Sequence, residues 1–273
     1  MALSLIPKDR TVAGLADIWA DTDALLAGLA PDDWKRPAPL PGWDVQALVS
    51  HIIGTESLLL GLDGPPAVDP DSFEHVRNQI GAFNEAWVVA LRDESPDAML
   101  ARLRELTGRR LEALRDMPQE EWDAESFTPA GPDSYGRFMQ IRVFDCWMHD
   151  QDARVALGMP LGATGAPAEI SLDEIERAMG FVVGKRAGAP SGSSVTLELT
   201  GEGGRSIHIA VGERASVVES LDGPATATLT MPAVSFARII GGRADAAAHE
   251  QQVAVSGDEQ LGRQVLANLS YMM

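Results

Sequence analysis

Two side chains that can bind a divalent metal lie on a helix face that should be buried. Asp145 and His149 are four residues apart in a segment with helical periodicity, so their side chains share one face. The same face carries Phe138, Ile141 and Met148, which are residues of a core-facing stripe. An isolated charge on such a face is costly, so the ionisable pair needs a partner. A metal ion would satisfy both side chains at once.

A third candidate ligand, His51, lies on the core face of an earlier predicted helix. That face also carries Ala47 and Leu58, with the small Gly54 beside it. If the two helices are neighbours, His51 completes a His, Asp, His site. Three nitrogen and oxygen ligands with an open fourth position are typical of a reactive zinc site, although Ni²⁺, Mn²⁺ and Fe²⁺ also suit them. Asp152 is placed to accept a hydrogen bond from a ligand histidine and orient it.

Each part of this pattern also has an ordinary explanation. Most Asp-x-x-x-His pairs on helices are surface pairs or simple hydrogen-bond pairs, and an inward histidine such as His51 is usually a satisfied core residue. Cys146 adjoins Asp145 but points about 100° away from the ligand face, so we expect a buried, inert thiol. The metal interpretation therefore depends on the combination of two inward faces.

Length, charge and cysteine content limit the classes of protein. The chain has 273 residues, enough for two domains, and its 45% hydrophobic and 23% charged residues indicate a globular protein. With 40 acidic and 22 basic residues, its net charge of −18 argues against nucleic acid as a partner. One cysteine excludes an intramolecular disulfide and a cysteine-based zinc motif. We see neither a signal peptide nor eighteen consecutive apolar residues, so we expect a cytoplasmic protein without a membrane span.

Residues 1–160 are expected to form a helical bundle. Asp44 and Ser95 are predicted N-caps, Pro96 suits the first helical turn, and Gly158 is a predicted stop signal. Several long helices with modest connections are typical of a bundle. The predicted helices cover residues 11–29, 45–62, 72–93, 96–117 and 134–157.

Residues 166–273 are expected to form an α+β domain after a Gly-, Ala- and Pro-rich linker at 159–169. Residues 193–200 and 205–212 alternate around GEGG, which predicts a hairpin. Further strands are predicted at 225–231 and 253–257. Helices are predicted at 171–187, 232–242 and 258–269, and we expect them to cover the sheet.

Two segments, GWDVQALVSHIIGTES (42–57) and RVFDCWMHDQDAR (142–154), resemble the DinB-like, mycothiol-dependent maleylpyruvate isomerase family. The resemblance covers nearly the whole chain and implies a DinB-like four-helix bundle followed by a small domain similar to sterol carrier protein 2 (SCP2-like). The matching residues are Gly42, Trp43, His51, Trp147, His149, Gln151, Asp152 and Arg154.

The resemblance implies zinc bound by His51, Asp145 and His149, although the family usually has Glu at the middle position. The shorter Asp145 would hold the metal closer to its helix. Mycothiol is implied as the thiol cosubstrate, whose thiolate attacks a small electrophilic substrate; for maleylpyruvate, addition, rotation and elimination give the trans isomer. A substrate carboxylate needs a cation, and Arg77 and Arg243 are our candidates. The sequence leaves open whether the protein is a monomer or a homodimer.

Two other functions stay open. A metal-dependent hydrolase would use zinc-bound water, with Asp152 or Glu56 as general base. A non-enzymatic protein would hold a structural metal and an apolar ligand. Dependence on a thiol separates the thiol-using isomerase or transferase from both of these alternatives.

Polar residues in 73–88, including His75 and Glu85, could line a pocket, but a solvated helix face is the simpler interpretation. The tryptophans are expected in the core.

Overall fold

The computed structural model describes residues 3–272 of the chain. It divides into two compact units, Met1–Pro160 and Leu161–Met273. The first unit is helical and the second combines a sheet with helices, so the predicted two-domain α+β class is confirmed. Within residues 3–272, no helix combines the length and apolar character needed to cross a membrane.

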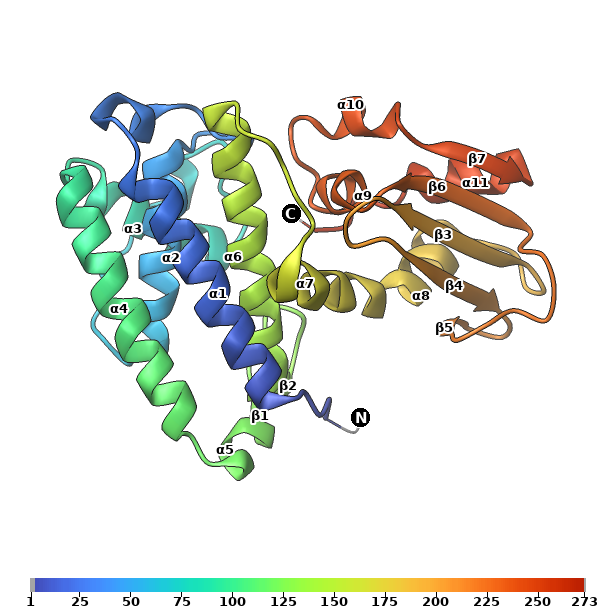
Figure 1. Ribbon diagram of the computed structural model, residues 1–273, viewed down its shortest axis with the longest axis horizontal. Coiled ribbons are helices and arrows are strands. Elements are labelled where there is room, and N and C mark those ends of the chain that lie inside the picture. The colour runs from blue at the N-terminus through green and yellow to red at the C-terminus, as the bar shows by residue number, and fades with distance from the viewer. Residues whose placement is uncertain (1–2, 273) are drawn as a thin grey trace. The chain divides into compact units, whose positions relative to one another are not determined.

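Four long helices form the bundle of the first unit (Figure 1). Helix α1 packs against α4 and α6, and α2 packs against the same two helices. The shorter α3 lies beside α2. The four bundle helices are α1 (Lys8–Ala27), α2 (Val45–Leu59), α4 (Pro96–Asp116) and α6 (Tyr135–Leu157), and α3 spans Gln79–Leu91. Their connections contain η1 (Pro31–Lys35), η2 (Pro70–Ser72), α5 (Gln119–Asp123), β1 (Glu125–Ser126) and β2 (Asp133–Ser134).

The predicted helix caps of the bundle are present. The Asp44 side chain accepts a hydrogen bond of 2.8 Å from the Ala47 N–H, which begins α2. Ser95 caps α4, with Pro96 as its first residue. Gly158 ends α6 in the left-handed conformation at φ 68°. These side-chain and glycine caps satisfy backbone groups that a helix end leaves without partners.

The prediction of a helix over residues 72–93 is wrong at its start. Helix α3 begins at Gln79, because Asn78 is extended and its side chain accepts from the Gly81 N–H at 2.8 Å. Its packing against α2 depends on a small residue: a Cβ on Gly54 would lie 2.5 Å from the Trp87 ring. Apolar periodicity indicated the body of this helix, but the cap set its first residue.

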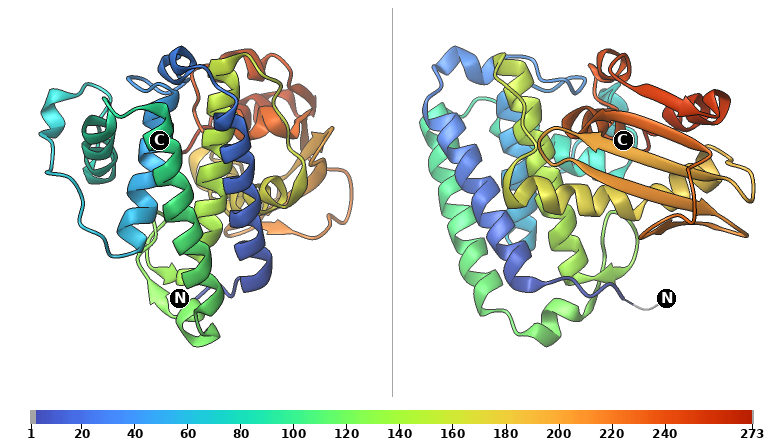
Figure 2. Two further views of the ribbon diagram at one scale, coloured as in Figure 1. Left: turned by 60° about the vertical axis from the view of Figure 1, so that its left-hand side comes forward. Right: turned by 45° about the vertical axis from the view of Figure 1, so that its right-hand side comes forward.

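The second unit contains a five-stranded sheet in the order β5-β4-β3-β6-β7 (Figure 2). The predicted hairpin is confirmed, because β3 and β4 pair antiparallel. β6 joins β3 in parallel, and β7 pairs antiparallel with β6. The edge strand β5 was not predicted. The strands are β3 (Ser194–Thr200), β4 (Arg205–Val211), β5 (Ala215–Val218), β6 (Ala227–Pro232) and β7 (Ala254–Gly257).

One face of this sheet carries the core of the second unit. Leu197 lies between Ile207 and Leu229 on neighbouring strands, and all three side chains are buried. Helix α9 (Ala233–Ile240) packs on β3 and β6, and α11 (Glu259–Leu266) packs on β6 and β7. A further short helix, α10 (Ala246–Glu250), packs against α9.

The predicted helix over residues 171–187 is divided in the structure. Helix α7 spans Gly165–Arg177 and therefore begins inside the predicted linker, α8 spans Met179–Phe181, and η3 spans Val182–Arg186. A Cβ on Gly184 would lie 2.5 Å from the Ala215 Cβ. This segment thus lies tightly against β5, an approach that the periodicity of the sequence could not reveal.

Candidate metal centre

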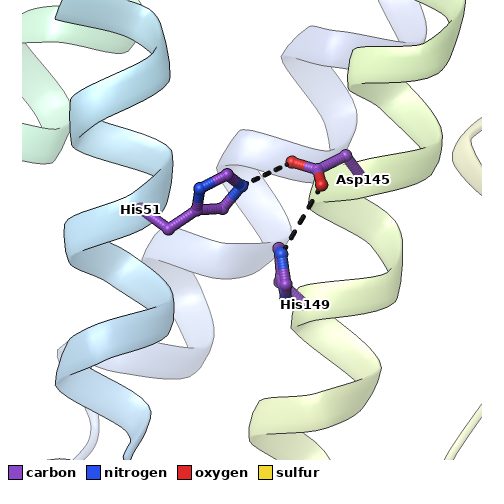
Figure 3. A group of neighbouring side chains, drawn as sticks. All are labelled: His51, Asp145 and His149. Carbon is purple, nitrogen blue, oxygen red and sulfur yellow. Dashed lines mark hydrogen bonds and ion pairs between the residues drawn. The ribbon is translucent and has the colours of Figure 1, made fainter. Parts of the chain in front are cut away.

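The three predicted ligands lie together inside the bundle (Figure 3). His51 comes from α2, while Asp145 and His149 come from successive turns of α6. One potential ligand atom from each residue lies within 4.8 Å of the other two. His51 Nε2 is 2.9 Å from Asp145 Oδ2, and His149 Nε2 is 3.5 Å from Asp145 Oδ1. The cluster thus presents two imidazoles and one carboxylate.

Exposure within the cluster is uneven. The side chains of His51 and His149 keep 8% and 7% of their accessible surface, whereas Asp145 keeps 29%. The imidazoles are therefore shielded from water, and the cluster opens to solvent beside the carboxylate. A small molecule could approach it from that side.

Charges around the carboxylate keep it ionised. Burial alone would raise the pKa of Asp145, but His51, Arg142 and His149 outweigh it and hold that pKa well below its ordinary value. Burial lowers the pKa of His51, which favours the neutral imidazole that binds metals. For His149, burial also acts downward, but Asp145 and Asp152 outweigh it and raise the pKa.

The two histidines are supported in different ways. Asp152 is buried, and its Oδ2 lies 3.2 Å from His149 Nδ1. The sequence predicted an orienting carboxylate at this position. A hydrogen bond to Asp152 keeps a proton on Nδ1 of His149 and leaves the lone pair on Nε2. His51 Nδ1 is buried without a hydrogen-bond partner in the described part of the chain.

Sequence reasoning missed a buried ionic network behind Asp145. Arg142 donates to Asp145 Oδ2 and also lies 2.8 Å from Glu56 Oε1. Arg110 lies 2.9 Å from Glu56 Oε2 and donates to the Tyr135 hydroxyl at 2.9 Å. A signal was present, because Arg142 stands three residues before Asp145 in a helix expected to be buried.

This network bears on the hydrolase alternative. Glu56 is 1% exposed and is held by two guanidinium groups, so its oxygens are occupied. Asp152 is completely buried and lies against His149. Neither carboxylate is placed to take a proton from a water molecule at the open side of the cluster.

A second polar group lies beside the histidines. The Trp43 ring centroid is 5.7 Å from that of His51 and 6.0 Å from that of His149. Its Nε1–H donates to Glu85 Oε2 at 3.2 Å, and His75 Nε2 lies 2.8 Å from the same oxygen. Glu85 is 2% exposed, so a solvated helix face is the wrong interpretation for this residue. Trp43 contacts the candidate ligands, whereas Trp147, the other tryptophan of the two motifs, is buried in the core.

Comparison with known proteins decides the family. The family model for the mycothiol maleylpyruvate isomerase N-terminal domain matches residues 15–154, and the model for the C-terminal domain of the same family matches residues 169–264. The chain belongs to the mycothiol maleylpyruvate isomerase family.

Two kinds of relative are similar over most of the chain. An uncharacterised Mycobacterium tuberculosis protein, present in two strains, is 28% identical over 190 residues, which cover 67% of this chain and 70% of the relative. Two crystal structures of the mycothiol-dependent maleylpyruvate isomerase, one of a histidine-to-alanine variant, match with a TM-score of 0.58 at 17% identity. They cover 92% of this chain and 93% of the matched chain, which shows a shared fold.

The two candidate arginines lie outside the clustered side chains. Arg77 is exposed just before α3. Arg243 belongs to the second unit, where it follows Gly242 and lies with Nη1 3.0 Å from the Gly241 carbonyl oxygen. A role for either residue in binding a substrate carboxylate stays a prediction in this member of the maleylpyruvate isomerase family.

Cys146 should resist alkylation in the folded protein. Its side chain is completely buried, and burial raises the pKa of the thiol to about 12. Only about one thiol in 10⁴ would be ionised at pH 8, because each pKa unit is a factor of ten. We expect no carboxamidomethyl adduct by mass spectrometry after iodoacetamide treatment at pH 8. One adduct should form in guanidinium chloride, and rapid labelling of folded protein would contradict the inert assignment.

Proposed function

We propose that this chain is a metal-dependent isomerase or S-transferase that uses a small-molecule thiol, with mycothiol as cosubstrate. Membership of the family supports mycothiol as the thiol. The observation that carries the proposal is the cluster of His51, Asp145 and His149, whose ligand atoms lie within 4.8 Å of one another. A structural ion would need a closed ligand set, whereas three residues leave a position for the thiol.

The donor set fits a divalent ion of the zinc type. Two imidazoles and one carboxylate suit Zn²⁺, and Ni²⁺, Mn²⁺ and Fe²⁺ accept the same ligands. Asp145 Oδ2 already accepts from Arg142 and lies against His51. We therefore assign Asp145 Oδ1, which faces His149, as the oxygen that would hold the ion.

The residues around the cluster have distinct tasks in this proposal. Asp152 holds a proton on His149 Nδ1 and so keeps Nε2 available as a ligand. Arg142 keeps Asp145 ionised, and Glu56 balances the charge of Arg142. A bound divalent ion would supply the positive charge that lowers the pKa of a thiol and stabilises its thiolate.

The thiolate defines the class of second substrate. A small molecule with an electrophilic carbon–carbon double bond can accept the sulfur, rotate about the resulting single bond and release the same thiol as the trans isomer forms. A substrate that loses another group would keep the new carbon–sulfur bond, which is the S-transferase outcome. Arg77 and Arg243 remain our candidates for holding a substrate carboxylate.

Thiol-dependent turnover is the direct test. With about one Zn²⁺ per chain and added mycothiol, we expect conversion of maleylpyruvate or of another small electrophilic alkene. Proton NMR of the vinyl couplings would detect isomerisation, and mass spectrometry would detect a mycothiol conjugate. His51→Ala should abolish both signals, since it removes a ligand.

Two controls make this experiment decisive. Omitting mycothiol should stop the reaction, while His208→Ala, which changes a histidine on β4 in the second unit, should leave it unchanged. If the metal-loaded protein converts none of a panel of electrophiles with mycothiol, yet hydrolyses esters or amides without it, the thiol function is wrong.

A further inference from the structure

The two candidate ligand histidines differ in what holds their rings. A ligand histidine usually donates its second ring N–H to a carboxylate, a carbonyl or water, which fixes the ring orientation. His149 has such an acceptor in Asp152, at 3.2 Å from Nδ1. His51 Nδ1 is buried and has no hydrogen-bond partner within residues 3–272. Apart from Asp145, which lies 2.9 Å from Nε2, the His51 ring is therefore held by packing contacts.

Trp43 packs beside the His51 ring. Its ring centroid lies 5.7 Å from that of His51, with 38° between the ring planes. The His149 ring lies 4.9 Å from His51 in an edge arrangement and 6.0 Å from Trp43. Aromatic rings at these separations attract each other, and their packing restricts the ring torsions. The three rings thus form one aromatic group.

The indole itself is fixed by a buried carboxylate. Trp43 Nε1–H donates to Glu85 Oε2 at 3.2 Å. His75 Nε2 lies 2.8 Å from the same oxygen, and Glu85 is only 2% exposed. The carboxylate oxygen accepts from the indole N–H, and we assign to His75 the tautomer that carries its proton on Nε2 and donates to the same oxygen.

Gly42 makes room for this arrangement. A Cβ at this position would lie 2.6 Å from His75 Nδ1, and the backbone φ of 80° favours glycine. The Gly-Trp pair before α2 therefore has a shared structural purpose: Gly42 admits the His75 ring, and Trp43 shares the Glu85 oxygen with that ring.

We propose that Trp43, anchored by Glu85 and His75, is the positioning residue for His51 at the metal centre. It does by aromatic contact what Asp152 does for His149 by hydrogen bonding. This inference rests on the proposed metal site, and its consequence is specific: the affinity and geometry of the bound ion depend on a side chain that does not itself bind it.

The test measures metal binding rather than turnover. Apo protein is titrated with Zn²⁺ against a chromophoric chelator, and the visible absorption of the Co²⁺-loaded protein is recorded. Trp43→Leu should weaken Zn²⁺ binding by about 10–100-fold, the range for loss of a group that orients a ligand. The Co²⁺ bands should also shift, because His51 is free to turn. Circular dichroism and thermal unfolding of the apo protein check that the variant is folded.

Conservative variants distinguish positioning from general damage. Trp43→Phe keeps an aromatic ring and should bind Zn²⁺ more tightly than Trp43→Leu. Glu85→Gln keeps a side-chain oxygen that can accept from the indole, so it should bind more tightly than Glu85→Leu. Phe73→Leu is the matched aromatic control, since the Phe73 ring packs against His75, with 5.9 Å between the ring centroids, rather than against His51. The Zn²⁺ affinity of Phe73→Leu should match that of the wild type.

The outcomes separate this inference from the proposed function. Wild-type protein that binds no Zn²⁺ overturns both. Wild-type binding with folded Trp43→Leu and Trp43→Phe variants that keep the same affinity and the same Co²⁺ spectrum overturns only the positioning role. Weakened binding in the predicted order supports it.

Discussion

His149→Ala is expected to reduce bound zinc from about one ion per chain to nearly none. The substitution removes one of three candidate ligand atoms that lie within 4.8 Å of one another, and it leaves Asp145 and His51 on different helices without the second imidazole. Thiol-dependent activity should fall to background when the metal is lost, because no ion then stabilises the thiolate. Elemental analysis of untagged protein, purified without chelators, measures the metal directly.

The matched control is His208→Ala, which removes a histidine that hydrogen-bonds Thr196 on the sheet of the second unit. Its metal content should equal that of the wild type. Added Zn²⁺ should also raise the unfolding temperature of the wild type but not of His149→Ala, since an ion that binds only the folded state stabilises it. Undiminished zinc in His149→Ala would place the metal elsewhere.

Glu56→Leu is expected to lower the free energy of unfolding by about 3–5 kcal/mol, which is the cost of removing one partner from a buried ion pair. Glu56 is 1% exposed and pairs with both Arg110 and Arg142, whose side chains are 2% and 4% exposed. Leucine would leave these guanidinium groups with fewer acceptors in the core. Urea denaturation followed by circular dichroism measures the change.

Two further variants identify the cause of this loss. Glu112→Gln changes an exposed acidic residue on α4 and should alter stability by less than about 0.5 kcal/mol. Adding Arg110→Met to Glu56→Leu should recover part of the loss, because Arg142 still has Asp145 as a partner. If the double variant is less stable than Glu56→Leu alone, unpaired charge is not the cause.

Local signals predicted most of the bundle. Asp44, Ser95 and Gly158 act within one or two turns of their own positions, so their cap roles can be recognised in the sequence. The spacing of Asp145 and His149 likewise places them on one helix face without knowledge of any neighbour. His51 could be chosen as their partner only on the assumption that α2 and α6 are adjacent, which they are.

The features that were missed depend on contacts between distant segments. Trp43 looked like a core residue, and its position beside His51 follows from an anchor, Glu85, that is 42 residues away. Arg142 could be recognised as unusual on a buried helix, but its partner Glu56 lies 86 residues earlier. The start of α3 is a local exception, because the Asn78 cap rather than the apolar pattern determines its first residue.

The ionic network that joins α4, α2 and α6 also limits how these helices can slide. An apolar core tolerates small axial shifts, because one aliphatic contact can replace another. A shift of α4 by one turn, about 5.4 Å, would carry the Arg110 guanidinium away from Glu56 and leave it buried without an acceptor. We expect the three helices to have a single axial alignment, which holds His51 level with the α6 turn that carries Asp145.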